Sequence, residues 1–157
     1  MAEVKKLPYK TYLAVINNSI NSNMFKEVYA KIDGRTVDVT RQGELSCAFF
    51  VSSILKMFNV AEGSHATVKS TVEDLEKSKW QKTETPSTGD VVVWKAIKFP
   101  NGEEHEHIGF VIGKNEAISN DFVSGTPQKH RFDQTPDGTK RQIDAVYHGR
   151  HLFEAGK

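Results

Sequence analysis

The sequence predicts an α+β domain in which N-terminal helices pack on a central antiparallel β-sheet meander. Two patterns support this fold class. In the first half of the chain, apolar residues recur at steps of three and four, as on a buried helix face. In the second half, short apolar or alternating segments are separated by turns that contain Gly, Asn and Pro. The length of 157 residues is typical of one domain, so residues 1–157 are expected to share a single core.

Helical spacing predicts three helices. Residues 9–32 carry apolar side chains at helical intervals, although four asparagines between positions 17 and 23 weaken the helix locally. Residues 47–58 are apolar on nearly all sides, which indicates a buried helix with Ser46 as its N-cap. A third helix is expected over residues 67–79.

Strands are expected mainly after residue 90, and Asp90 itself is interpreted as a turn residue or loop anchor. Gly and Pro residues spread over 124–140 indicate a long loop there. The expected strands are 36–40, 91–99, 105–112, 116–123 and 143–148.

Composition excludes several classes of protein. A net charge of +1 gives no support for nucleic-acid binding, and no apolar run is long enough to span a membrane. The N-terminus lacks the apolar segment of a Sec signal peptide, so a cytoplasmic protein or export by another route is expected. The single cysteine rules out an intramolecular disulfide and a cysteine-rich zinc site. Nothing in the sequence fixes the oligomeric state.

Cys47 is the candidate nucleophile because it begins the buried helix directly after a loop. Unpaired backbone N–H groups at a helix start stabilise a thiolate and can hold an oxyanion during acyl transfer. Such cysteines often have a depressed pKa. The alternative from position alone is a cysteine that only fills space beside Phe50.

His107 is the candidate general base, since a nucleophilic cysteine needs one. It opens a segment, 107–113, that reads as a buried strand and would hold the imidazole rigidly. His105 lies on the same expected strand. The other four histidines are expected to face solvent, and they are His65, His130, His148 and His151.

Asn120 is the candidate third residue, on the basis of strand pairing. If Lys114-Asn115 is a two-residue hairpin turn, Gly109 pairs with Asn120, whose amide then lies diagonally beside His107. That contact could fix the imidazole tautomer so that the other ring nitrogen faces Cys47. A three-residue loop would instead bring Ser119 or Asp121 to this face.

Four segments in order resemble the NlpC/P60 and CHAP cysteine hydrolases of the papain-like class, over residues 46–120. In that family a cysteine begins a buried helix, a Gly-Asp pair opens a strand, and a His-hydrophobic-Gly strand precedes a polar residue. The matching segments here are Ser46-Cys47-Ala48-Phe49-Phe50-Val51, Gly89-Asp90-Val91-Val92-Val93-Trp94, His107-Ile108-Gly109-Phe110-Val111-Ile112-Gly113 and Ala117-Ile118-Ser119-Asn120. The family usually has Asp-Cys-Ser-Gly around the nucleophile, whereas this chain has Ser46-Cys47-Ala48-Phe49.

The resemblance implies a papain-like core and a cysteine amidase or endopeptidase that cleaves an amide bond in peptidoglycan stem peptides. A common family target is the bond from γ-D-glutamate to a diamino acid. Cys47 would form an acyl-enzyme and His107 would act as its base. No cofactor or metal is implied, and the partner is a peptide or other amide substrate. A compact form of this kind also resembles small amidase effectors that bacteria deliver into competitors.

Two other interpretations remain open at this stage. The run Glu104-His105-Glu106-His107 places two imidazoles on one strand face, and Cys47 could complete a metal site. The chain could also be an inactive relative that serves as a binding protein, because fold does not imply function.

Overall fold

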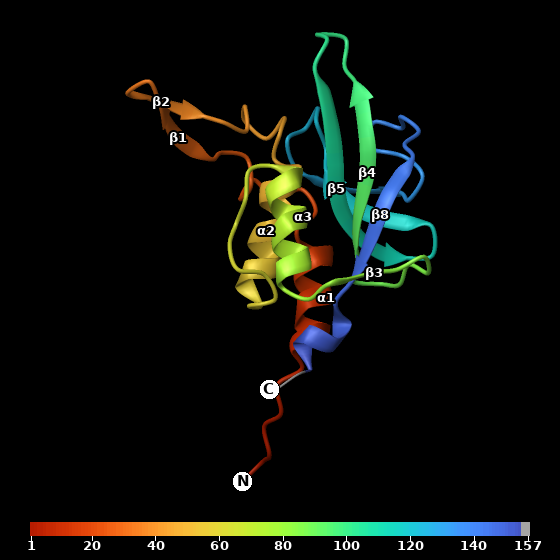
Figure 1. The fold of residues 1–157 in the computed structure, drawn as a ribbon. Coiled ribbons are helices and arrows are strands. Elements are labelled where there is room, and N and C mark those ends of the chain that lie inside the picture. Colours follow the sequence, from red (N-terminus) through yellow and green to blue (C-terminus); the bar gives the residue numbers. More distant parts are fainter. Residues whose placement is uncertain (155–157) are drawn as a thin grey trace.

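Three helices pack against one face of a six-stranded antiparallel sheet in the computed structural model, which describes residues 1–154 (Figure 1). The helices are α1 (Pro8–Asn18), α2 (Cys47–Met57) and α3 (Val68–Lys77). The predicted α+β class is therefore confirmed, and the last two helices agree with the expected segments within one or two residues. Thr67 caps α3 by accepting a hydrogen bond from the backbone N–H of Ser70.

The large sheet has the strand order β3-β8-β4-β5-β6-β7, and every neighbouring pair is antiparallel. Strands β4 to β7 follow one another as a meander, whereas β8 returns to the free side of β4. The strand bounds are β3 Gln81–Lys82, β4 Val91–Lys98, β5 Glu104–Gly113, β6 Glu116–Asn120, β7 Pro127–Arg131 and β8 Ile143–His148.

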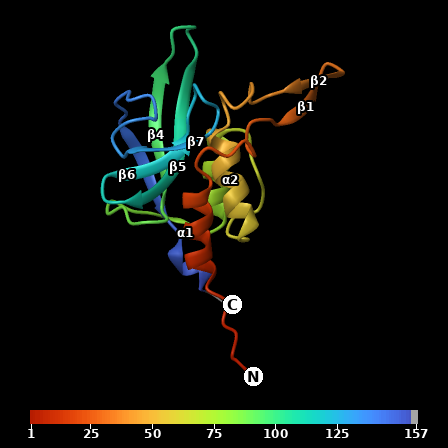
Figure 2. The same cartoon turned by 180° about the vertical axis from the view of Figure 1, so that it is seen from behind.

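The prediction of one helix over 9–32 is wrong after Asn18. The chain leaves the helix through Asn21, which has a left-handed backbone with φ of 66°. It then forms a two-stranded hairpin, β1 (Tyr29–Ile32) with β2 (Arg35–Asp38). Its turn is Asp33-Gly34, where both residues have positive φ, as a tight hairpin turn requires. This hairpin projects away from the helices and the large sheet in both views (Figures 1 and 2).

The prediction of an unbroken loop over 124–140 is also wrong, because β7 lies inside it. Pro127 stands at the first position of this edge strand, where the missing N–H costs no ladder bond. Strand β6 accordingly ends at Asn120, opposite Pro127, and not at residue 123. This added strand brings residues 127–131 alongside β6, the strand that follows the His107-bearing β5 in the meander.

The core lies mainly between the helices and the sheet. Aromatic rings meet edge to face there, including the pairs of Phe50 with Phe110 and of Tyr12 with Phe110. A second, smaller cluster covers the other face of the sheet and contains Val92, Trp94, Val111, Ala117 and Val146. Alternate residues of β4 and β5 therefore serve two separate apolar layers.

A short 3-10 helix, Arg150–Phe153, ends the described chain and inserts Phe153 into the main core. The Phe153 side chain is fully buried and lies 4.4 Å, centroid to centroid, from the Tyr12 ring. Within residues 1–154, no helix combines the length and apolar character needed to cross a membrane.

We expect Phe153→Ala to lower the free energy of unfolding by about 3–5 kcal/mol, because it leaves a cavity in the core. Phe122→Ala is the matched control, since Phe122 is 36% exposed. Urea denaturation followed by fluorescence measures both. Equal, small effects would contradict the view that the C-terminal turn completes the core.

Candidate active site

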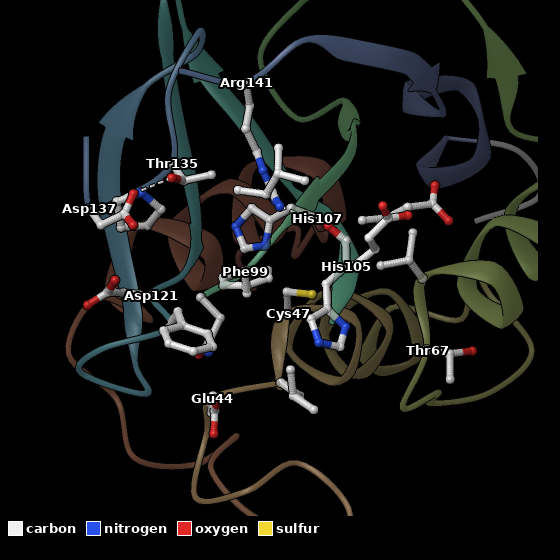
Figure 3. A pocket seen from close by; sticks show the side chains of 18 of the residues that line it. Glu44, Cys47, Thr67, Phe99, His105, His107, Asp121, Thr135, Asp137 and Arg141 are labelled. Atoms are coloured by element: carbon white, nitrogen blue, oxygen red, sulfur yellow. Dashed lines mark hydrogen bonds between the residues drawn. The ribbon is translucent and has the colours of Figure 1, made fainter. Parts of the chain in front are cut away.

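Cys47 and His107 line the same pocket, which has a volume of about 410 Å³ (Figure 3). Its walls come from the start of α2 and the loop before it, the start of α3, the β4–β5 hairpin, the end of β6 and the segment that precedes β8. A cavity of this size accommodates a ligand of a few residues or fewer. Two of the sequence-predicted site residues are thus brought together from positions sixty residues apart.

Cys47 is the first residue of α2, as expected, and Ser46 is the N-cap. The Ser46 side chain makes no capping hydrogen bond, so it does not occupy the first backbone N–H groups of α2. The expected depression of the thiol pKa is not found. Burial raises the pKa of Cys47, and the backbone N–H groups of Ile108 and Ala48 and the charge of Arg141 lower it less. The thiol therefore needs a base to become a nucleophile.

His107 lies on β5 opposite Trp94 of β4, and the two rings are 5.3 Å apart between centroids. Burial lowers the pKa of His107 well below its ordinary value of 6.5, and the positive charge of Arg141 lowers it further. The imidazole is therefore neutral near neutral pH. A neutral imidazole has one nitrogen free to accept a proton.

In residues 1–154, no hydrogen bond joins the Cys47 thiol directly to the His107 ring. The two residues are nevertheless neighbours in space, because the backbone N–H of Ile108, the residue after His107, acts on the Cys47 sulfur. Catalytic hydrogen bonds are often long in unliganded enzymes and shorten with substrate bound.

Ser119, and not Asn120, contacts the His107 ring. The two-residue turn at 114–115 is present, because Gly113 pairs with Glu116. A bulge between Val111 and Gly113 then shifts the register by one residue, so that Gly109 pairs with Ser119. The Oγ of Ser119 consequently lies 2.7 Å from Nε2 of His107. The predicted contact of Asn120 with His107 is wrong for this reason.

Asn120 instead links β6 to the loop that leads into α2. Its Nδ2 donates to the carbonyl oxygen of Gly43 at 2.6 Å, and its Oδ1 is buried without a partner. This bond holds the loop four residues before Cys47. Asn120 still lines the pocket.

His130 also contacts Ser119. The sequence did not predict this, because His130 was expected to face solvent. Its Nε2 lies 2.7 Å from Ser119 Oγ, and its Nδ1 lies 2.8 Å from the carbonyl oxygen of Arg131. It stands on β7, and the loop interpretation of 124–140 hid that strand. The sequence signal for this strand was the alternation of Gln128 and His130 after a proline.

The direction of these hydrogen bonds assigns the tautomer of His107. A carbonyl oxygen only accepts, so His130 must carry its proton on Nδ1. Burial lowers the pKa of His130, so the ring is neutral and its Nε2 accepts from the Ser119 hydroxyl. Ser119 then has no proton left for His107 and must accept from its Nε2–H. The free acceptor of His107 is therefore Nδ1.

Arg141 is the second functional candidate that sequence reasoning missed. It precedes β8, is buried and lines the pocket beside Cys47 and His107 (Figure 3). Its Nη2 donates to the carbonyl oxygen of His105 at 2.8 Å, whereas its Nε has no partner. Nothing in the local sequence distinguishes this arginine from a surface one.

The outer part of the pocket combines aromatic and acidic side chains. The rings of Phe99 and Phe122 stack with centroids 5.0 Å apart. The acidic side chains on the wall are Glu44, Glu104, Glu106, Asp121 and Asp137. The ring of His105 is paired with Glu103 at 2.8 Å. Residues 1–154 contain no group of three or more His, Cys, Asp and Glu that could hold a metal ion.

Asp90 has the anchoring role that its turn position predicts. Its buried carboxylate accepts from the backbone N–H of Ser87 at 2.9 Å and contacts Nδ1 of His148 at 2.7 Å. Neither Asp90 nor His148 lines the pocket. The Gly-Asp pair therefore fixes the start of β4 and takes no direct part in the site.

Comparison of the chain with protein-family models gave no match, and no curated protein matched it.

We expect NMR of the ring nitrogens to show His107 protonated at Nε2 and unprotonated at Nδ1. Ser119→Ala removes the acceptor for Nε2–H, so the two tautomers should become mixed. Ser87→Ala is the control, because it removes a hydroxyl 3.4 Å from another histidine, His148. A wild-type His107 protonated at Nδ1 would refute the assigned direction.

Proposed function

We propose that the chain is a cysteine amidase or endopeptidase that cleaves an amide bond in peptidoglycan stem peptides. One observation carries the chemistry: a thiol at an uncapped helix start shares a pocket with a neutral imidazole whose Nδ1 is free to accept a proton. The substrate class rests on the resemblance of residues 46–120 to the NlpC/P60 and CHAP hydrolases.

In the first step, Nδ1 of His107 takes the proton of the Cys47 thiol while the sulfur attacks the carbonyl carbon of the scissile amide. The carbonyl oxygen becomes an oxyanion. It accepts hydrogen bonds from the backbone N–H of Cys47 and a neighbouring N–H in the first turn of α2. The positive end of the helix dipole also favours this charge.

In the second step, the His107 imidazolium gives its Nδ1 proton to the leaving nitrogen, and the C–N bond breaks. The product amine departs, and a thioester joins the acyl group to Cys47. Water then attacks the thioester and loses a proton to His107, which returns it to the sulfur as the acid is released. No cofactor takes part in this sequence.

Ser119 and His130 act as positioning residues in this scheme. When His107 gains a proton at Nδ1, its Nε2–H still donates to Ser119, so the ring does not need to turn. The chain of hydrogen bonds ends on the carbonyl oxygen of Arg131, which stays an acceptor throughout. The base is therefore held in one orientation in both of its protonation states.

The proposal is tested by incubating the protein with defined muropeptides and identifying the products by mass spectrometry. Wild type should yield two fragments from one amide bond. Cys47→Ala should lose roughly a thousandfold or more in rate, and His107→Ala roughly a hundredfold or more. His151→Ala is the control, since His151 is exposed and does not line the pocket. A chelator should leave the rate unchanged.

Identical products from wild type and Cys47→Ala would contradict the proposal and favour an inactive binding protein on this fold. Loss of activity with the chelator would favour the metal site instead.

We also expect the acid limb of kcat/KM to lie below pH 6.5. Burial and the positive charge of Arg141 lower the pKa of His107, so the free enzyme keeps its base neutral down to that lowered value. Activity therefore falls only when the pH drops through it. A pH profile of muropeptide cleavage measures the limb, and half-loss at or above pH 6.5 would contradict the neutral-base scheme.

A further inference from the structure

Arg141 is a buried cation without a carboxylate partner among residues 1–154. The residue is 7% exposed, and its side chain donates one hydrogen bond, from Nη2 to the backbone carbonyl oxygen of His105. The Nε–H donor lies in the interior with no acceptor. Buried charges in folded proteins are normally paired, because removing an ion from water is costly. This guanidinium therefore lacks the anion that its burial calls for.

The acidic side chains nearby make their hydrogen bonds with other groups. Asp137 acts on the charge of Arg141, but its Oδ1 accepts from the Thr135 hydroxyl and the Thr139 N–H, and the carboxylate forms no ion pair with the guanidinium among residues 1–154. Glu103 is held by a two-point hydrogen bond with Arg41 and by His105. No ion pair joins Arg141 to either carboxylate in the part of the chain that the structure describes.

The guanidinium lies at the reaction centre of the proposed function. Its charge acts on the sulfur of Cys47 and on the ring of His107, and all three line the same cavity. Figure 3 shows the Arg141 side chain running toward His107 from the segment before β8. A group bound to Arg141 would therefore sit beside the carbonyl that Cys47 attacks.

We propose that Arg141 binds a carboxylate group of the substrate, close to the scissile carbonyl, and so selects anionic acyl donors. This inference rests on the proposed function for the identity of the reacting carbonyl, but the anion site itself does not. A carboxylate supplies the acceptor that Nε lacks, and the planar guanidinium suits a two-point contact with it.

The charges on the wall restrict the rest of the ligand. Five acidic side chains line the pocket, against the two cations Lys69 and Arg141. An anion is therefore favoured only at Arg141, and the outer part of the pocket favours a neutral or positively charged group. The fitting substrate carries a carboxylate inward and an amine or neutral chain outward.

The test compares alkylation of Cys47 by iodoacetate and by iodoacetamide. The two reagents differ only in that the first carries a carboxylate where the second carries a carboxamide. In both reactions the sulfur forms a bond to the methylene carbon and iodide leaves. The ratio of the two rates is divided by the same ratio for glutathione. We expect wild type to prefer iodoacetate by roughly 10- to 100-fold, the effect of a hydrogen-bonded charge.

Arg141→Gln should reduce this normalised ratio to that of glutathione, and Arg141→Lys should retain part of it. Lys69→Gln is the matched control, because it removes the other cation of the wall and should leave the ratio unchanged. An unchanged ratio in Arg141→Gln would overturn the proposal. This includes the case in which both rates fall equally, since Arg141 would then stabilise only the thiolate.

A second measurement needs neither a reactive thiol nor a folded Arg141 variant. In Cys47→Ala, the NMR signal of the Arg141 side-chain Nε–H should shift on titration with acetate and stay unmoved with acetamide. No response to acetate would overturn the proposal. Because binding is read directly, these outcomes differ from a failure of muropeptide cleavage, which would affect the proposed function alone.

Discussion

The single proton of the Ser119 hydroxyl is the constraint on which the candidate site depends. The carbonyl oxygen of Arg131 forces His130 to donate from Nδ1, and this directs the hydroxyl proton toward His130. Ser119 can then only accept from His107, which leaves the other imidazole nitrogen free. A backbone carbonyl on the edge strand β7 thereby sets the proton-accepting side of the proposed base, across two side chains.

Burial gives this site a resting state without an ion pair. It raises the pKa of the Cys47 thiol and lowers that of the His107 imidazole, so the uncharged forms of both are favoured. In the proposed mechanism, charge separation then accompanies substrate binding, when the helix N–H groups and the substrate share the new charges. Such a site reacts slowly with small thiol reagents at low pH and gains most from correctly placed substrate.

The spacing of apolar residues predicted the elements that have a plainly apolar face. The other elements depend on backbone geometry, which this spacing does not encode. α2, β4 and β5 were found because each buries a continuous apolar surface. The bulge after Val111 leaves the alternating pattern intact while moving Ser119 into the place expected for Asn120. Strand β7 is a polar edge strand headed by Pro127, and this composition resembles a loop. Arg141 became visible only through its burial, which no local pattern reports.

The buried polar side-chain atoms that lack a hydrogen-bond partner lie mostly around the candidate site. Among residues 1–154, four buried side-chain atoms have no hydrogen-bond partner, and three belong to Ser46, Asn120 and Arg141. Asn120 and Arg141 line the pocket, and Ser46 directly precedes the thiol. Each such atom costs stability, so a folded core normally avoids them. Their concentration around Cys47 indicates that this region keeps donors and acceptors open for a ligand, at the expense of the stability that pairing them within the chain would give.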